Sequence, residues 1–255
     1  MSGEPVVPVS RLSLQLYTLR GPLGEDPEAT LRRVAEIGFR NVEPFGFVGS
    51  ADRYKGLLDA TGLSAPSGHA GLVGPDRDPQ AAIEDAVELG MTTIVDPSIR
   101  IDWASREEVV AAAGELNGVA RRAAERGVRV GYHNHWWELE SVIDGVSALE
   151  VFADALDDSV VLEVDTYWAE VGGAPAVELL GRLGERVALI HVKDGAVSRD
   201  NEEQTAVGSG SLDVGAILAA APQALRVVEL DGFNGDIFDA VRDSFAYLTA
   251  HGVPA

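Results

Sequence analysis

Eight short apolar runs, each followed by a segment with helical spacing of apolar residues, recur along the chain about every 20–35 residues. The runs are residues 11–20, 39–45, 63–69, 92–98, 128–133, 160–165, 187–191 and 226–230. Parallel strands need long crossover connections, and helices supply them. Eight such units within 255 residues predict an α/β fold, a single-domain (β/α)₈ TIM barrel of residues 11–255 behind an N-terminal tail of residues 1–10.

Helix boundary signals support the same alternation. Asp26-Pro27 and Asp78-Pro79 are typical helix starts, and Gly38 and Gly90 are typical stops. The competing fold is an open doubly wound sheet, which normally carries a glycine-rich phosphate turn after its first strand. The segment YTLRGPLGED at residues 17–26 has no such turn. The sequence therefore favours the closed barrel.

Composition removes several classes of function. Twenty Lys and Arg stand against 41 Asp and Glu, a formal net charge of −21, so the chain would repel a nucleic acid backbone. The absence of cysteine excludes disulfides and thiolate metal sites. No run reaches the ~18 apolar residues of a membrane helix, and residues 1–10 do not resemble a signal peptide. We expect a cytoplasmic protein without a membrane partner.

The last four strands share a design in which an apolar run ends in acidic or imidazole side chains. The segments are GYHNHWWELE (131–140), VVLEVDTYW (160–168), VALIHVKD (187–194) and LRVVELDG (225–232). Strand side chains alternate between the two faces of a sheet. This alternation turns one set toward the barrel interior, namely His133, His135, Glu163, Asp165, His191, Lys193, Glu229 and Asp231.

A divalent metal is the cofactor that this arrangement predicts. Buried carboxylates that lie close together cannot all stay ionised without a cation. Mixed oxygen and imidazole ligands without sulfur suit Mn²⁺, our first choice, and also Co²⁺, Zn²⁺, Mg²⁺ or Fe²⁺.

The same segments resemble the sugar phosphate isomerase/epimerase family of xylose isomerase-like TIM barrels. The most specific pieces are YHNHWWELE, EVDTYWAEVGG, HVKD, VGSGSLD and VVEL. The family holds its metal with Glu, Asp, His and Glu from the last four strands, and the last three carry over to Asp165, His191 and Glu229. Where the family usually has its first Glu, this chain has His133. The resemblance therefore gives the ligand set His133, Asp165, His191 and Glu229, with Glu163 or Glu138 as alternatives to His133.

The resemblance implies a divalent-metal-dependent isomerase or epimerase of a sugar or keto-sugar in carbohydrate metabolism. Such an enzyme abstracts a proton next to a carbonyl through a metal-stabilised enediolate. Glu229 is the expected base. Its expected catalytic partner is Glu163, with His135 or Lys193 as alternatives.

Further strand-end residues are expected to bind substrate. They are His135, Lys193, His69, Trp168 and Glu43. Trp168 stands where many family members carry a substrate-binding histidine, and Lys193 could instead pair with Asp194. No basic cluster suits a phosphate, so the expected substrate is a non-phosphorylated sugar or cyclitol. The glycine-containing loop 195–211 could close over it.

Two other functions remain open from the sequence. The same enolate chemistry could expel a leaving group, which would make the chain a lyase or dehydratase of a keto-inositol or keto-sugar, including a 3-keto-glycoside. The altered first ligand also allows a non-catalytic sugar-binding barrel. A metal-dependent DNA-repair endonuclease is disfavoured by the net charge of −21. A homo-oligomer is possible, and the sequence does not decide it.

Overall fold

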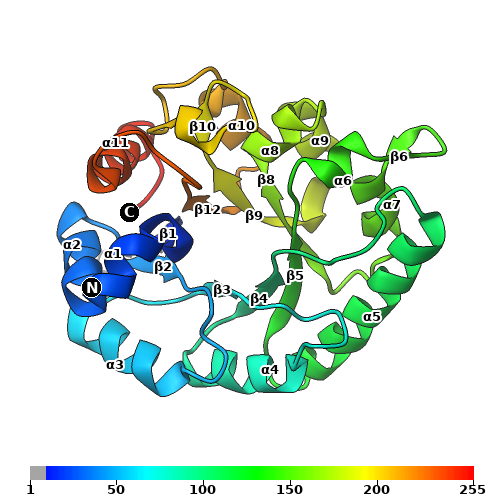
Figure 1. Cartoon of the computed structure of the whole chain (residues 1–255), viewed down its shortest axis with the longest axis horizontal. Helices are drawn as coiled ribbons and strands as arrows, with labels where there is room; N and C mark the ends of the chain where they lie inside the picture. Colours follow the sequence, from blue (N-terminus) through cyan, green and yellow to red (C-terminus); the bar gives the residue numbers. More distant parts are fainter. Residues whose placement is uncertain (1–9) are drawn as a thin grey trace, which may run out of the picture.

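The computed structural model describes residues 10–255, and eight parallel strands in it form a barrel ringed by helices (Figure 1). The strands are β1 (Leu12–Gln15), β2 (Asn41–Glu43), β3 (Ser67–His69), β4 (Thr93–Asp96), β5 (Arg129–His133), β8 (Val161–Asp165), β9 (Val187–Val192) and β12 (Leu225–Val228). Their hydrogen-bonded order is β2-β1-β12-β9-β8-β5-β4-β3. Isolated parallel bridges between Asn41 and Ser64 and between Phe45 and His69 bring the two ends together. The predicted TIM barrel is confirmed.

Helices cover the outside of the barrel between successive strands. They are α1 (Arg20–Glu25), α2 (Pro27–Ile37), α3 (Ala51–Thr61), α4 (Pro79–Glu88), α5 (Arg106–Ala124), α6 (Trp137–Glu140), α7 (Ala148–Ala155), α8 (Thr166–Val171), α9 (Ala176–Leu183), α10 (Val214–Ala220) and α11 (Ile237–Ala250). The Asp-Pro signals start helices as expected. Asp26 accepts a hydrogen bond from Ala29 N and Asp78 from Ala81 N, so each carboxylate caps a helix whose first residue is proline.

Several short elements were not predicted from the sequence. The run 11–20 is a strand only to Gln15, whose side chain accepts from Tyr17 N and begins a 3₁₀ turn, Leu16–Leu19, that leads into α1. Helix α8 follows β8 directly, and α6 begins four residues after the end of β5. Two small hairpins, β6–β7 (Val142–Ile143 and Val146–Ser147) and β10–β11 (Asp194–Gly195 and Gln204–Thr205), and 3₁₀ turns at Gly184–Arg186 and Asn201–Glu203 complete the chain. The predicted tail of residues 1–10 lies outside the described residues except for Ser10.

Strand alternation divides the core into an outer and an inner part. Tyr132 points to the helix layer, where its ring packs 4.8 Å from Phe152 and 5.6 Å from Trp103. Inside the barrel, Val161, Leu189 and Val227 form a separate small apolar cluster. Each of these three stands two residues before a polar side chain at or just beyond the end of its strand, namely Glu163, His191 and Glu229. The interior therefore changes from apolar to polar toward the carboxyl ends of the strands.

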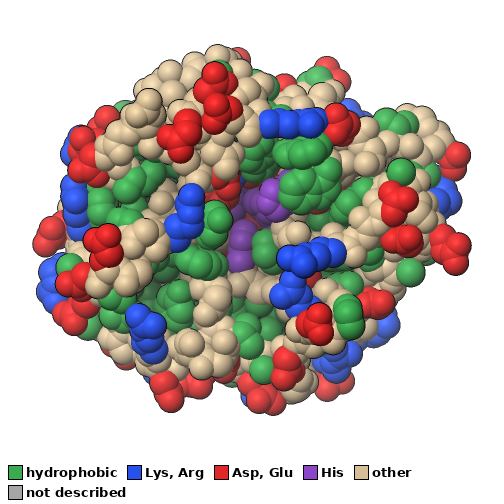
Figure 2. Space-filling model, viewed as in Figure 1, with side chains coloured by type: hydrophobic (Ala, Val, Ile, Leu, Met, Phe, Trp, Pro, Cys, Tyr) green, Lys and Arg blue, Asp and Glu red, His purple; other side chains and the backbone are tan. Residues whose placement is uncertain are grey.

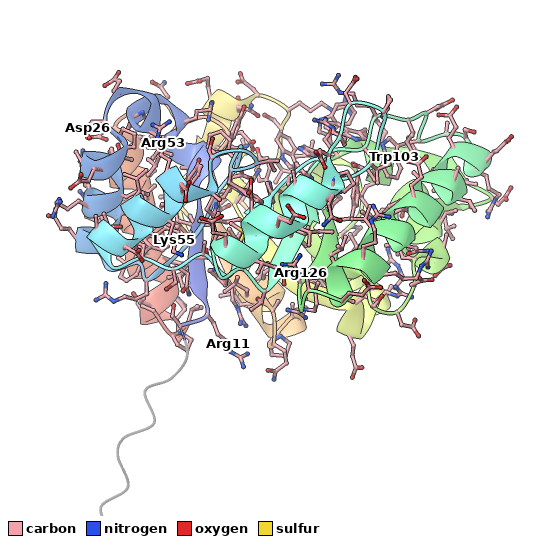
Figure 3. All side chains as sticks on the ribbon, turned by 90° about the horizontal axis from the view of Figure 1, so that it is seen from below. Arg11, Asp26, Arg53, Lys55, Trp103 and Arg126 are labelled. Carbon is pink, nitrogen blue, oxygen red and sulfur yellow. The ribbon has the colours of Figure 1, made fainter. Side chains whose placement is uncertain are left out.

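A side view separates the two ends of the barrel (Figure 3). Arg11 and Arg126, which precede β1 and β5, lie near the lower edge, whereas Asp26 and Trp103, in connections that follow β1 and β4, lie toward the upper edge. The strand-end side chains of the candidate site therefore face the upper edge. In the described part of the chain, no helix combines the length and the apolar character needed to cross a bilayer.

Candidate metal centre

Four strands that neighbour one another in the sheet deliver the predicted ligands to one place. Asp165 pairs in register with His191, and Val227, two residues before Glu229, also pairs with His191. His133 lies beside Glu163 on the other side. Because parallel strands end at the same edge, residues in register point into the same layer of the barrel.

The four side chains that we call the metal-candidate cluster are His133, Asp165, His191 and Glu229. One ligand atom from each lies within 4.8 Å of all the others. The closest pair is His191 Nδ1 and Glu229 Oε2 at 2.8 Å, and Asp165 Oδ2 is 3.9 Å from both His133 Nε2 and His191 Nδ1. All four residues are buried. The sequence thus identified side chains that do converge.

The two oxygens of the Asp165 carboxylate have different surroundings: one caps a helix and the other faces the metal-candidate cluster. Oδ1 accepts a hydrogen bond from Trp168 N and caps α8. Oδ2 is buried and accepts no well-aligned hydrogen bond. Asn134 Oδ1 accepts from Asp165 N at 3.1 Å, and Asn134 Nδ2 donates to Asp165 O at 3.3 Å. These two bonds fix the backbone of Asp165 and so the direction of its carboxylate. A carboxylate oxygen fixed in direction beside two imidazoles is a donor set that fits a divalent cation.

Lys193 places an ammonium within the same group of acids. Its Nζ lies 3.0 Å from Asp165 Oδ2, 2.8 Å from Glu229 Oε2 and 2.6 Å from Asp231 Oδ2. Burial opposes the charge on Lys193, but the three carboxylates outweigh it and raise the pKa well above its ordinary value. Once His191 is neutral, as a metal ligand must be, three carboxylates and one ammonium leave two uncompensated negative charges. A divalent cation would balance them, so the residues fit a metal.

The alternative partner for Lys193, Asp194, is engaged elsewhere. Its carboxylate accepts hydrogen bonds from the backbone N–H groups of Gly195, Gly208, Gly210 and Leu212. Consecutive strand residues face opposite sides, which separates Asp194 from its neighbour. The pairing that the sequence left open is therefore with Asp231.

Those four bonds also tie down part of the loop 195–211, for which the sequence allowed closure over substrate. A Cβ on Gly210 would lie 2.1 Å from the Asp194 carboxylate, and one on Gly208 would lie 2.2 Å from the Tyr247 ring. Both glycines are required for close packing. Arg199 in the same loop pairs with Glu140 at 2.7 Å and lies 3.6 Å from the centre of the Trp136 ring.

A second acidic group, which we call the Glu43–His69–Glu163 group, lies against the other edges of the two ligand imidazoles. Glu163 Oε2 is 2.6 Å from His69 Nε2, and Glu43 Oε1 is 3.2 Å from the same nitrogen. Glu43 is also held by Gln15 and Ser67. Burial disfavours a charged His69, but the two carboxylates raise its pKa to about 10. Burial and the neighbouring Glu43 act to raise the pKa of Glu163. The stronger opposing effect of His191 and His69 brings this pKa down to about 2, below its ordinary value.

A cavity of about 660 Å³ opens over the metal-candidate cluster. Figure 2 shows two purple imidazole patches in the hollow at the centre of the upper face, bordered by green apolar groups. Among the predicted residues, His69, His133, His135 and Glu229 line this cavity. Glu43 and Glu163, by contrast, are fully buried. The cavity wall also includes Tyr17, Phe45 and Arg77, which no strand-end pattern predicted.

Of the remaining candidates, His135 lines the cavity and Trp168 does not. His135 stacks on Trp137 with ring centres 4.2 Å apart, and burial, together with the charge of Lys193, lowers its pKa to about 4. It is therefore neutral at neutral pH. Trp168 lies on α8 rather than on a strand, with Lys193 Nζ 5.3 Å from its ring centre and its Nε1 unpartnered.

Glu138 does not reach the metal-candidate cluster. Its Oε1 accepts from Tyr132 Oη at 2.5 Å and its Oε2 from His135 N at 2.8 Å. These bonds stabilise the turn between β5 and α6. Burial raises the pKa of Glu138 to about 7, against the lowering effect of the Tyr132 hydrogen bond.

Comparison with known proteins places this barrel in a family. The family model described as xylose isomerase-like TIM barrel matches residues 31–226, and the chain belongs to this family. A sugar phosphate isomerase/epimerase from Parabacteroides distasonis has a similar structure, with a TM-score of 0.83, 25% identity, and 100% of this chain and 98% of that chain covered. The predicted resemblance is confirmed.

Two more distant structures share the fold. One is a protein named IOLI with a bound zinc atom, with a TM-score of 0.71, 14% identity, and 95% of this chain and 98% of that chain covered. The other is a probable 3-DHS dehydratase, AsbF, from Bacillus anthracis, with a TM-score of 0.72, 15% identity, and coverage of 93% and 98%. No curated protein matches the chain. The fold thus occurs in proteins named as epimerases and as a dehydratase.

Proposed function

We propose that the chain is a divalent-metal-dependent isomerase or epimerase that acts on a non-phosphorylated sugar or keto-sugar. The observation that supports this most is the convergence of His133, Asp165, His191 and Glu229 within 4.8 Å beneath an open cavity. Burial and the neighbouring His191 keep the pKa of His133 well below its ordinary value, so the imidazole is neutral, as a metal ligand must be. Manganese remains our first choice of metal.

The bound cation would supply Lewis acidity, making the C–H bond next to a substrate carbonyl more acidic. Glu229 is the proposed base. It lines the cavity, and although burial disfavours its charge, Lys193 and His191 keep its pKa well below the ordinary value. It is therefore ionised and can accept a proton at neutral pH. In this proposal Glu229 removes the proton from the substrate carbon next to the carbonyl.

Lys193 and His135 are the proposed partners of Glu229. Lys193 Nζ lies 2.8 Å from the Glu229 carboxylate, so its ammonium can offset charge that develops on a substrate oxygen. His135 is neutral and lines the cavity, so it can donate or accept a hydrogen bond from a substrate hydroxyl. A proton returned to the same carbon gives epimerisation, and one returned to the adjacent carbon gives isomerisation.

A lyase is the second candidate, and the position of Lys193 favours it. An ammonium beside the base can stabilise, by charge and hydrogen bonding, an oxygen that leaves from the carbon next to the enolate. The two reactions share the first proton transfer and differ only in the fate of the enolate.

Incubation of the Mn²⁺-loaded protein with a panel of keto-sugars in D₂O separates the candidates. Deuterium uptake without loss of a group supports the isomerase, and release of water or an aglycone supports the lyase. Glu229→Gln should lower the rate of exchange about 10²–10⁴-fold. Purified protein that holds no metal and whose stability ignores added Mn²⁺ would instead support a non-catalytic sugar-binding barrel.

A further inference from the structure

The rings of His133 and His191 each stand between two sets of acids. His191 Nδ1 is 2.8 Å from Glu229 Oε2. At the opposite edge of the ring, Nε2 is 3.0 Å from Glu43 Oε1 and 3.2 Å from Glu163 Oε2. The ring is fully buried, so neither nitrogen faces bulk solvent. Its two nitrogens therefore meet different carboxylates.

His133 repeats this arrangement with its ring reversed. Its Nε2 lies 3.9 Å from Asp165 Oδ2, and its Nδ1 lies 3.2 Å from Glu163 Oε2, an ion-pair distance at which the two atoms are not aligned as a hydrogen bond. Among residues 10–255, Glu163 is the only acid within ion-pair distance of that Nδ1. One oxygen of Glu163 thus lies between the two rings, on the side away from Asp165.

A neutral imidazole has one N–H group and one lone pair, and a carboxylate can only accept. When Asp165 and Glu229 bind a cation, the carboxylates left to accept from the rings are Glu163 and Glu43, so the nitrogen that faces them is the one that carries hydrogen. We propose that Glu163 and Glu43 are positioning residues that fix the tautomers of His133 and His191, so that His133 Nε2 and His191 Nδ1 present lone pairs to a metal. This inference rests on the proposed metal site, and it assigns Glu163 a role outside the ligand shell and outside proton transfer.

The same geometry explains why Glu163 does not replace the missing carboxylate ligand. Its Oε2 is already 2.6 Å from His69 Nε2, besides its contacts with the two rings. A carboxylate that accepts from the distal nitrogen of a metal-bound histidine orients the ring and makes it more basic. His133 brings one negative charge fewer to the ligand set than a glutamate would, and the ionised Glu163 behind it strengthens the imidazole as a donor.

One competing arrangement uses the opposite nitrogens. His69, His133, Glu163 and His191 also have ligand atoms within 4.8 Å of one another. An ion there would bind Glu163 directly, and Asp165 and Glu229 would lie outside its shell. The two arrangements demand opposite tautomers of both rings, which makes them experimentally distinct.

The first experiment measures Co²⁺ affinity by competition with a chelator, together with the visible spectrum of the bound ion. Glu163→Gln should weaken binding about 10–100-fold, as is usual when the partner of a metal-bound histidine is removed. The spectrum should keep its shape, because the ligands stay the same. Glu138→Gln is the matched control, since Glu138 is buried and contacts neither ring. It should retain wild-type affinity.

The second experiment needs no variant and so does not depend on how well Glu163→Gln folds. Long-range ¹H–¹⁵N spectra of the Zn²⁺-loaded protein report which ring nitrogen carries hydrogen. The expected result is hydrogen on His133 Nδ1 and on His191 Nε2. The opposite tautomers, or a Glu163→Gln variant that binds as well as wild type, would overturn the inference and leave the proposed function intact.

Two further outcomes distinguish a failure of this inference from a failure of the proposed metal site. If Glu163→Gln abolishes binding while Asp165→Asn preserves it, the ion occupies the competing arrangement and the inference is wrong. Wild-type protein that takes up neither Co²⁺ nor Zn²⁺ would overturn the metal site itself, and the inference with it.

Discussion

Lys193 Nζ lies 3.0 Å from Asp165 Oδ2, and both side chains are fully buried. The ammonium therefore lies against two of the predicted metal ligands, Asp165 and Glu229. It offsets only one of the three carboxylates around it. The stability of this region should consequently depend on both Lys193 and a metal.

Lys193→Met keeps the length of the side chain and removes its charge. In metal-free protein we expect a loss of about 3–5 kcal/mol, the usual cost of leaving buried charges without a partner. In saturating Mn²⁺ the loss should be smaller, because the ion compensates the same carboxylates. Urea unfolding with EDTA and with Mn²⁺ measures both values. Lys55 is the other lysine of the chain and is exposed. Lys55→Met should change the free energy of unfolding in neither condition. Equal losses in the two conditions would contradict the shared compensation.

Metal affinity should fall as the pH is lowered. Burial raises the pKa of Asp165 to about 6, although Lys193 and His191 oppose the shift. Burial disfavours a charged His191, but Glu163 and Glu229 raise its pKa, so the metal must also displace a proton from that ring. Each proton in competition with the metal costs about tenfold in affinity per pH unit below the pKa. We expect a steep decrease in Mn²⁺ affinity between pH 7 and pH 5, measured by chelator competition. A constant affinity over this range would exclude these residues as ligands.

His69 should stabilise the metal-free protein in a defined pH range. Its folded-state pKa of about 10 lies above the unfolded value of 6.5, so the contribution is complete below about pH 6.5 and is lost as the pH rises through about 10. His69→Phe leaves Glu43 and Glu163 without this cation and should cost about 3–5 kcal/mol at pH 7. The difference from wild type should shrink at pH 10.5. Urea titrations at both pH values test this, and a difference that does not change with pH would show that His69 is neutral.

Asp194→Asn should release the loop that the four backbone N–H groups tie to this carboxylate. The amide has a single acceptor oxygen and no charge, so we expect a loss of about 2–3 kcal/mol, the order of a charged hydrogen bond. Trypsin should cleave more readily at Arg199, which lies in this loop. Glu202→Gln, at an exposed position of the same loop, is the control. Unchanged cleavage would mean that other contacts hold the loop.

The sequence was most informative where a signal is local and periodic. Apolar runs located all eight strands, and Asp-Pro pairs located two helix starts. It was least informative where the chain changes direction soon after a strand, as at Gln15, where one side chain caps a 3₁₀ turn inside an otherwise alternating run. Short helices such as α6 and α8 have too few turns to show a period.

Within a strand, the sequence by itself determined which side chains turn inward, because alternation is a property of the backbone. It brought Asp165, His191 and Glu229 together correctly, and it could have separated Lys193 from Asp194 by the same rule. Only the tertiary structure decided which groups meet across the barrel. Glu43 and His191 are 148 residues apart in the chain, yet their polar atoms are 3.0 Å apart. Closure of the sheet places their strands around one small interior, and no local pattern encodes the distances inside it.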